Sequence, residues 1–297
     1  MPFSQEREEN DLASQRLVSL SAKQSSFINI SHQSVMLKTG IYVDAENIKM
    51  SGGYGMRYDV LVDIANTPTS ILLRANCYLA EDRDRTSKEP DYRQKVYFYH
   101  NILRQCGFKI IKKYVRRYED EDGNVTTKAN ADMDLAIDAL LQARNLDRII
   151  ILTGDGDFIR LVTALQNMGC RVDVIGFNNV SRELREVADS FLSGFLIPGL
   201  LPFQPQPEDI VHKEGEWQRG TVANFNADRG FGFFRFFRMQ PDHILRPETV
   251  FFHLSKSTLE GDYYFQDSTR IFEFRIVENP HNEGRSEAWD IRLVREN

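Results

Sequence analysis

From Gly40 to about residue 196, short apolar runs alternate with longer stretches in which apolar residues recur with helical spacing. Strands separated by helices of about 10 to 15 residues need crossover connections, and crossovers make neighbouring strands parallel. The pattern therefore predicts an α/β fold with a doubly wound parallel sheet. The apolar runs fall at 41–43, 70–79, 109–118, 148–152 and 171–177, and the helical stretches at 56–65, 92–106, 131–143, 158–168 and after residue 181.

Three finer details follow from the same pattern. Gly107 and Gly169 come just before strands, where helices commonly end on a glycine in the left-handed conformation. The segment 119–124 is acidic and predicts a turn between two extended arms. In the helix at 131–143, helical spacing groups four apolar residues into one stripe, which we expect to be buried. This stripe consists of Met133, Ala136, Ile137 and Leu140.

The pattern of apolar and polar residues changes at a proline-rich stretch between about residues 198 and 207, which is typical of a linker. Beyond it, short aromatic and apolar runs without helical spacing predict a small β barrel. The predicted barrel strands are 220–226, 231–237, 250–253, 270–277 and 288–294. We expect four segments: a flexible arm at 1–37, an α/β domain at 38–196, a linker at 197–215 and an all-β domain at 216–297.

Composition and charge narrow the class of protein. No apolar run approaches the roughly 18 residues that span a bilayer, and the polar, acidic start of the chain is unlike a secretory signal. Cys77, Cys106 and Cys170 lie far apart, which predicts neither a disulfide framework nor a zinc site. We therefore expect a cytoplasmic protein with no membrane contact and with small, buried thiols. The net charge of −6 argues against wholesale binding of nucleic acid but leaves room for a local basic strip.

Acidic side chains recur where a strand ends or a helix starts. Asp44 follows the apolar run at 40–43, and Asp155 follows the run at 148–152. If these runs are neighbouring parallel strands, both carboxylates emerge at one edge of the sheet, where open α/β sheets carry their sites. Crowded carboxylates repel one another unless a cation lies between them. Hard divalent cations prefer oxygen ligands, so we predict a Mg²⁺ or Mn²⁺ site.

Further polar residues are placed to complete this site. Asp132 and Asp157 each begin a helix, Asn47 can orient a water or a phosphate, and Asp138 lies on a helix face. The alternative is that each aspartate is only a cap or a turn residue, because aspartate favours both positions. That alternative is weaker for Asp44 and Asp155 taken together. We expect metal ligation by Asp44, Asp132 and Asp155, and catalysis by Asp44, Asp132, Asp155 and Asp157 with support from Asn47 and Asp138.

These acidic residues lie in motifs that resemble a known family. The motifs are Asp44-x-x-Asn47, Lys128-x-x-x-Asp132 with Asp138 beyond it, and Thr-Gly-Asp-Gly-Asp-Phe at 153–158. As a set they are similar to the NYN domain, a member of the PIN-like nucleases, over about residues 38 to 196. Ala129 departs from the pattern, because the family usually has glycine there. The resemblance implies a metal-dependent ribonuclease site with Asp44, Asp132, Asp155 and Asp157 as its acidic centre.

Aromatic residues alternate along two of the predicted barrel strands. Phe231 and Phe233 share one face of their strand, and Phe251 and His253 share one face of the next. A row of exposed rings beside an arginine, here Arg229, is typical of proteins that stack the bases of a single strand. The alternative is that rings fill the barrel core. We expect core positions for Phe225, Phe234 and Phe252.

The segment 216–297 resembles the cold-shock domain, which is an OB-fold barrel. The matching motifs are Gly-Thr-Val at 220–222, Gly-Phe-Gly-Phe at 230–233 and Phe251-x-His253-x-Ser255. Ala223 and Asn224 stand where the family has lysine and tryptophan, and 238–247 is an insertion. Because acidic residues also outnumber basic ones in this segment, we expect either weak and strongly salt-sensitive binding of nucleic acid or a different partner.

A basic strip is predicted along the strand at 109–118, flanked by basic residues of a preceding loop. One interpretation is a solvated edge strand, which often carries lysine. Beside an acidic metal site, a path for a phosphate backbone is comparably favoured. The candidates for backbone contact are Lys112, Lys113 and Arg116, and the flanking residues are Arg83, Arg85, Lys88 and Arg93.

Together these features predict a Mg²⁺- or Mn²⁺-dependent endoribonuclease that hydrolyses phosphodiester bonds of single-stranded RNA, while the barrel binds the strand. The preference for RNA over single-stranded DNA rests on the family resemblance alone. One alternative is a non-catalytic RNA-binding regulatory protein, and another is a nuclease or phosphoesterase that acts on DNA.

Overall fold

The computed structural model describes residues 36–119, 125–128, 131–203, 215–278 and 285–294. The side chains of 116–119 and 125–128 are not among the described parts. Contacts between residues divide the chain into one unit of Met1–Val35 and another of Met36–Asn297. All but the last two residues of the predicted arm, and most of the predicted linker, therefore lie outside the described residues.

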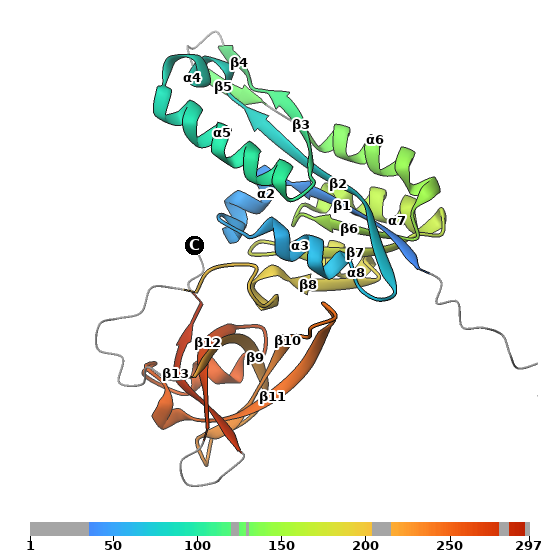
Figure 1. Ribbon diagram of the computed structural model, residues 1–297. Helices are drawn as coiled ribbons and strands as arrows, with labels where there is room; N and C mark the ends of the chain where they lie inside the picture. Colours follow the sequence, from blue (N-terminus) through green and yellow to red (C-terminus); the bar gives the residue numbers. More distant parts are fainter. Residues whose placement is uncertain (1–35, 120–124, 129–130, 204–214, 279–284, 295–297) are drawn as a thin grey trace, which may run out of the picture. The chain divides into compact units, whose positions relative to one another are not determined.

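The α/β part is built on a parallel sheet in which every neighbouring pair of strands runs in the same direction. Its order is β3-β2-β1-β6-β7-β8, so the chain first builds outward from β1 and then returns to add β6 on the other side. This confirms the predicted doubly wound sheet (Figure 1). The strands are β1 (Leu37–Asp44), β2 (Ser70–Glu81), β3 (Lys109–Tyr114), β6 (Arg148–Leu152), β7 (Arg171–Gly176) and β8 (Ser190–Ser193).

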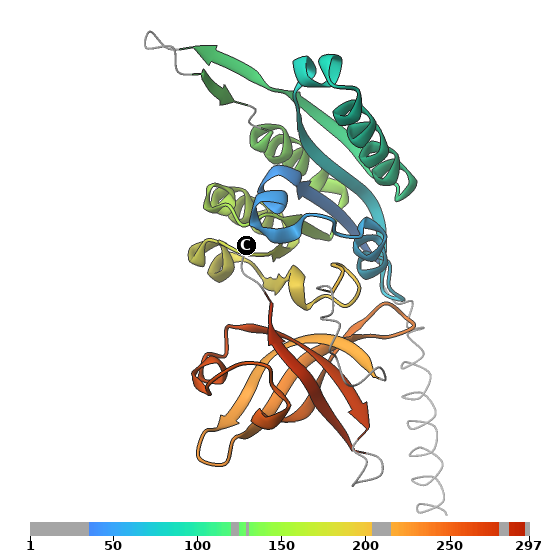
Figure 2. The ribbon, with the colours of Figure 1, turned by 90° about the vertical axis from the view of Figure 1, so that its left-hand side faces the viewer.

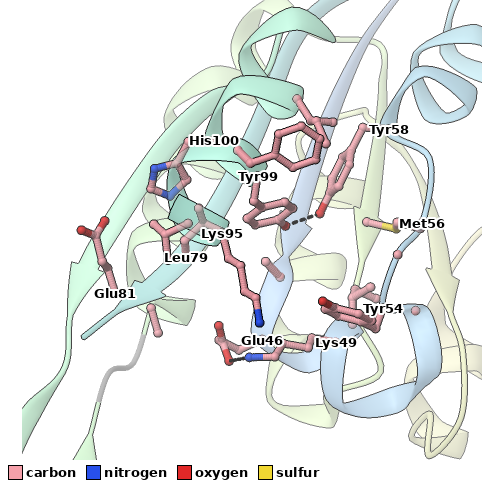
Figure 3. A pocket seen from close by; sticks show the side chains of 18 of the residues that line it. Glu46, Lys49, Tyr54, Met56, Tyr58, Leu79, Glu81, Lys95, Tyr99 and His100 are labelled. Atoms are coloured by element: carbon pink, nitrogen blue, oxygen red, sulfur yellow. Dashed lines mark hydrogen bonds and ion pairs between the residues drawn. The ribbon is translucent and has the colours of Figure 1, made fainter. Parts of the chain in front are cut away.

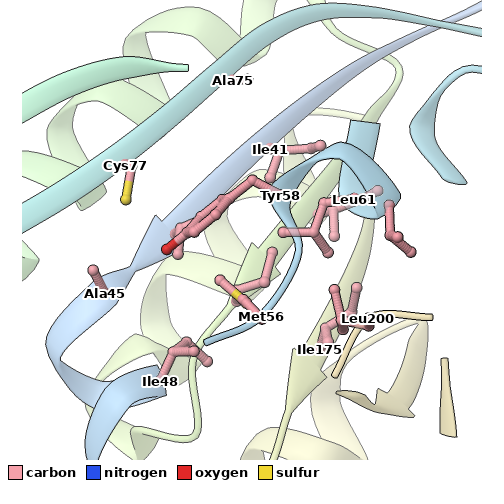
Figure 4. Close-up of a cluster of buried hydrophobic side chains, with 14 of the residues drawn as sticks. Ile41, Ala45, Ile48, Met56, Tyr58, Leu61, Ala75, Cys77, Ile175 and Leu200 are labelled. Atoms are coloured by element: carbon pink, nitrogen blue, oxygen red, sulfur yellow. The ribbon is translucent and has the colours of Figure 1, made fainter. Parts of the chain in front are cut away.

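Helices cover both faces of this sheet, because alternate strand residues point to opposite sides. On one face, Ile41 and Val43 of β1 join a core with helices α2 (Ala45–Ile48), α3 (Tyr58–Ala65) and α5 (Pro90–Gln105) (Figures 1 and 4). On the other face, Tyr42 joins a core with α6 (Asp132–Gln142), α7 (Ile159–Asn167) and α8 (Arg182–Val187). Burial of both faces explains why the central strands read as continuous apolar runs.

The ends of α5 and α7 follow the sequence closely. Gly107 and Gly169 adopt φ values of 83° and 90°, which lie in the left-handed region that favours glycine. Each glycine turns the chain from a helix into the next strand, β3 or β7. The predicted helix C-caps are therefore confirmed at both positions.

The orientation of α6 differs from the prediction. Leu135 and Ala139 are fully buried, whereas Met133 is 66% exposed and Ile137 is 47% exposed. This helix carries apolar residues on more than one side, so helical spacing cannot decide which side faces the sheet. The side that faces the sheet carries Leu135 and Ala139, and Asp138 beside it accepts a hydrogen bond from the hydroxyl of Tyr78 on β2.

The predicted strand at 109–118 is divided in two. β3 ends at Tyr114, and β4 (Arg116–Glu119) pairs antiparallel with β5 (Val125–Lys128) as a separate ribbon. The two arms that flank the predicted acidic turn therefore exist, while residues 120–124 lie outside the described parts. The basic residues before β3 are also not in a loop, because Arg83–Lys88 forms helix α4 and Arg93 lies on α5.

The C-terminal strands form a closed barrel in the order β10-β11-β13-β12-β9, in which β11 and β13 are the parallel pair. This strand order agrees with an OB-like fold and confirms the predicted barrel (Figure 2). Its interior is filled largely by phenylalanine rings, including Phe234, Phe252 and Phe274. The predicted insertion at 238–247 extends the hairpin of β10 and β11. The strands are β9 (Glu216–Asn226), β10 (Phe231–Met239), β11 (Leu245–His253), β12 (Ile271–Glu278) and β13 (Ser286–Leu293).

Two simple expectations concern the chain as a whole. Cys77, Cys106 and Cys170 are free thiols, of which two are buried and Cys106 is half-buried. Within the described residues, no helix combines the length and the apolar character needed to cross a bilayer.

Candidate active site at the carboxyl edge of the sheet

Asp44 lies where β1 ends and α2 begins. It is 7% exposed, and one carboxylate oxygen accepts a hydrogen bond from the backbone N–H of Asn47 at 3.2 Å, as an N-cap does. The other oxygen accepts the hydroxyl of Thr153 at 3.3 Å. Because Thr153 directly follows β6, this contact joins the carboxyl ends of two adjacent central strands.

The loop after β6 is fixed by a second contact of the same kind. The side-chain oxygen of Asn47 accepts the N–H of Gly154 at 2.8 Å. Asp155 donates its own N–H to the Thr153 hydroxyl at 3.2 Å, and its carboxylate accepts the N–H of Asp157 at 2.9 Å. Asn47 was predicted to orient water or phosphate, but its amide oxygen is already engaged in holding this loop. The predicted neighbours Asp44 and Asp155 are thus linked through Thr153.

The acidic side chains act on one another through space. The pKa of Asp44 is raised to about 6, mainly by burial and to a smaller extent by the nearby charges of Asp132 and Asp155, against the opposing effect of its two hydrogen bonds. Burial also raises the pKa of Asp132, followed by the charges of Asp155 and Asp157. The charges of Asp132, Asp155 and Asp157 thus act within the same edge of the sheet as Asp44.

Two other acidic residues of α6 have partners away from this edge. Asp138, predicted as a supporting residue, accepts the hydroxyl of Tyr78 at 2.9 Å. Asp134 forms an ion pair with Lys113 of β3 at 2.9 Å. Both contacts hold α6 against the sheet, so these side chains have a structural role that does not depend on a metal ion.

The chemistry of the donor set fits a hard divalent cation, because it consists of carboxylate oxygens whose repulsion a cation would relieve. Within the described residues, however, no three Asp, Glu, His or Cys side chains are arranged closely enough to hold a metal ion together. The charge of Asp155 raises the pKa of both Asp44 and Asp132, but the three side chains do not converge on one point.

The predicted aromatic strip on the barrel is brought together by strand register. Phe231 lies opposite His253, and Phe233 lies opposite Phe251. The rings of Phe231 and Phe233 each lie 5.7 Å from that of Phe251, and the Arg229 guanidinium lies 5.4 Å from the Phe231 ring. Phe233 and His253 are exposed, and Phe231 and Phe251 are half-buried. The expected core rings behave differently, because Phe234 and Phe252 are buried and Phe225 is half-buried against them.

The predicted basic strip is largely paired within the protein. Lys112 forms an ion pair with Glu81 at 2.7 Å, and Lys113 pairs with Asp134. Arg83 lies over the ring of Tyr114 at 3.4 Å. For Arg116 only the backbone, in β4, is described. Alternation along a strand indicates which residues share a face but not which acids lie across from them, so these pairs were not foreseen.

Two features of the site were missed by sequence reasoning. Thr153 holds both Asp44 and Asp155, and its place directly after an apolar run was a usable signal. A cavity of about 500 Å³ lies beside α2 and is lined in part by Tyr54, Lys95 and Tyr99 (Figure 3). No local pattern indicates this cavity, because its walls come from segments that are distant along the chain.

Comparison with known proteins assigns the α/β part of the chain to a family. The family model described as the NYN domain matches residues 38–198, which is more than half of the chain. This chain belongs to the NYN domain family. The NYN domain is a member of the PIN-like nuclease superfamily, so the predicted resemblance is confirmed for this part of the chain.

Two individual proteins are similar to the NYN region. The "Low amplitude and bright protein LabA" of Synechococcus elongatus is 25% identical over 181 residues, which is 59% of this chain and 92% of that protein. A Vibrio parahaemolyticus protein of unknown function has a crystal structure that matches with 28% identity and a TM-score of 0.43. That match covers 54% of this chain and 93% of the Vibrio chain.

Proposed function

We propose that the NYN domain hydrolyses phosphodiester bonds of single-stranded RNA with the help of Mg²⁺ or Mn²⁺. The observation that carries this proposal is the burial of Asp44 at the meeting point of β1 and β6, within the electrostatic reach of Asp132 and Asp155. Keeping several carboxylates together costs free energy that a purely structural edge would avoid. Membership of a nuclease-like family supports the same function.

The residues take distinct roles in this proposal. Asp44, Asp132 and Asp155 would hold the cation, and Asp157 would support it or position a water molecule. When bound, the cation would activate water and offset the charge that builds on the phosphodiester. Near neutral pH, Asp44 is mainly ionised, because its pKa of about 6 lies below the ambient pH, so its carboxylate is available as a ligand. Thr153 and Asn47 orient Asp44 and the loop that carries Asp155.

The barrel supplies strand binding in this proposal. Its strip of Phe231, Phe233, Phe251 and His253, with Arg229, offers ring faces for stacking successive bases. Joining a binding module to the NYN domain raises the local concentration of strand at the acidic edge. Because Lys112 and Lys113 already form ion pairs, β3 contributes less to contact with the phosphate backbone of RNA than its charge alone suggests.

The test is cleavage of an end-labelled single-stranded RNA with Mg²⁺ or Mn²⁺, compared with EDTA. We expect Asp155→Asn to lower the rate about a hundredfold or more, because it removes a charge from the cation site. Asp147→Asn is the matched control. Asp147 precedes the same strand at its opposite end, and its carboxylate accepts the N–H of Lys38 at 2.8 Å, which asparagine can still do. Equal cleavage by wild type and Asp155→Asn would place the activity elsewhere.

A non-catalytic RNA-binding role is the second candidate, favoured by the lack of a converged metal-binding group within the described residues. It predicts RNA binding without cleavage and with little effect of EDTA. Running the same assay with single-stranded DNA of identical sequence tests the remaining alternative, a nuclease that acts on DNA.

A further inference from the structure

The cavity of about 500 Å³ lies directly behind the candidate active site. One wall is α2, which starts immediately after Asp44, together with the π-helical segment Lys49–Gly53 and the residues that follow it. The other wall is α5, and the end of β2 lies between them (Figure 3). Sites for small ligands typically measure roughly 300–1,000 Å³. The space suits one unstacked nucleoside and excludes a base-paired helix.

Aromatic side chains line this cavity from both walls. Tyr54, just beyond the π-helical segment, is 78% exposed, and Phe98 of α5 is 66% exposed. Tyr99 lies deeper, and its hydroxyl shares a hydrogen bond with that of Tyr58. Aromatic side chains gathered around a hollow offer a contiguous apolar surface, and such surfaces mark binding sites. Planar ring faces are the surfaces on which unpaired bases stack.

Charged groups at the mouth of the cavity complement a nucleotide. Lys95 extends from α5 toward Glu46 and Lys49 on the opposite wall (Figure 3). Glu46 and Lys49 form a loose ion pair at 3.7 Å, with side chains that are 41% and 58% exposed. Two ammonium groups suit a phosphate, and the carboxylate of Glu46 can accept N–H groups from the edge of a base.

We propose that this cavity is a nucleobase pocket, which holds one unstacked base and its ribose from the RNA strand next to the bond that is cleaved. Ala45 lines the cavity and directly follows Asp44, so a nucleotide seated here lies one residue away from the acidic edge. The pocket fixes the register of the strand on the NYN domain, while the barrel holds bases further along. This inference rests on the proposed function for the identity of its ligand.

The first test maps the strand on the full-length protein, with Asp155→Asn to prevent cleavage. A set of short RNAs carries 4-thiouridine at one position each, and crosslinked peptides are identified by mass spectrometry after irradiation. We expect one position to crosslink to Tyr54 or to the α5 peptide that holds Phe98 and Tyr99. Crosslinks confined to the barrel would overturn the pocket.

The second test measures affinity with matched variants. We expect Tyr54→Ala to weaken binding about tenfold, because one stacking contact is lost. Tyr97→Ala is the control, since Tyr97 is 64% exposed on the same α5 but does not line the cavity. We expect the RNA affinity of Tyr97→Ala to stay within about twofold of that of the protein without this substitution. With an RNA that is abasic at the crosslinked position, the protein with Tyr54 and the Tyr54→Ala variant should bind with the same affinity.

These outcomes separate the pocket from the catalytic proposal. If the crosslink and the abasic effect appear but the wild type never cleaves RNA, the pocket stands and the ribonuclease proposal fails. If the wild type cleaves RNA while Tyr54→Ala and Lys95→Ala bind and cleave like the parent, the pocket is wrong and the ribonuclease proposal stands. Absence of RNA binding overturns both.

Discussion

At the scale of single residues, Asp44 is a buried carboxylate whose charged form is only partly stabilised by hydrogen bonds. Burial disfavours its charged form, and two hydrogen bonds from Asn47 and Thr153 offset part of that cost. Its pKa in the folded protein therefore exceeds the ordinary value of 3.8. Such a group destabilises the metal-free protein at neutral pH, and a cation would reverse that effect.

The sign of this effect gives a stability prediction. Between the ordinary pKa of 3.8 and the folded value of about 6, the folded state holds a proton that the unfolded state has lost, so stability falls as pH rises through this range. In EDTA near pH 7, we expect the free energy of unfolding of Asp44→Asn to exceed that of wild type by about 1–3 kcal/mol. The advantage should vanish near pH 4.

Urea unfolding at several pH values measures this difference. Asp147→Asn, at the other end of β6, serves as the control and should show no such pH-dependent gain. A difference between Asp44→Asn and wild type that does not change with pH would contradict the assigned cause.

A second residue-level prediction concerns Asp138, which the sequence grouped with the active site. The Tyr78 hydroxyl donates to Asp138 and accepts from the side-chain amide of Asn76. Tyr78→Phe leaves both partners without this contact, so we expect a loss of about 1–2 kcal/mol in the free energy of unfolding. Asp138→Asn should keep the cleavage rate within about threefold of wild type, unlike Asp132→Asn. If Asp138→Asn lost most of its cleavage activity while its stability stayed unchanged, Asp138 would belong to the active site.

At the scale of elements, β10 carries an exposed ring and a buried ring at consecutive positions. Phe233 is 36% exposed on the outer strip, whereas its neighbour Phe234 is fully buried and its ring lies 4.2 Å from that of Phe252. Alternation along a strand places consecutive rings on opposite faces. The two residues therefore allow a matched comparison of the same substitution.

We expect Phe233→Ala to weaken binding of single-stranded RNA by about 1–3 kcal/mol, because a stacking surface is lost. Its stability should change little. Phe234→Ala should instead lower the free energy of unfolding by about 3–5 kcal/mol through the cavity that it leaves. Fluorescence anisotropy and thermal unfolding of both variants check this contrast. Unchanged RNA binding by Phe233→Ala would remove the strip from the proposed interface.

At the scale of the whole molecule, charge limits how the protein can hold RNA. The net charge is −6, and Lys112 and Lys113 already pair with acidic side chains. Because these two lysines of β3 are already paired, we expect RNA affinity to depend mainly on stacking with a small number of ionic contacts, which makes it less salt-sensitive than the sequence alone suggested. Raising the salt concentration from about 50 to 200 mM should weaken binding about tenfold. Anisotropy titrations across this range measure the slope, and a loss beyond about a thousandfold would indicate many phosphate contacts.

Much of this molecule follows from local sequence patterns. Alternating apolar runs and helical stretches predicted the parallel sheet, and glycines predicted the ends of two helices, because both signals depend on backbone geometry within a few residues. The apolar runs before Asp44 and Asp155 also placed these acids at strand ends. Aromatic alternation predicted the shared face of Phe231 and Phe233.

Other properties were decided only by tertiary structure. The pairing of β1 with β6 brings Asp44 to Thr153, the side of α6 that faces the sheet leaves Met133 exposed, and acids from other elements neutralise Lys112 and Lys113. The cavity beside α2 exists because segments far apart in sequence meet around it. Local spacing sets the type of each element and the face on which a side chain lies. Which faces meet depends on how whole elements pack, and that information is spread over the entire chain.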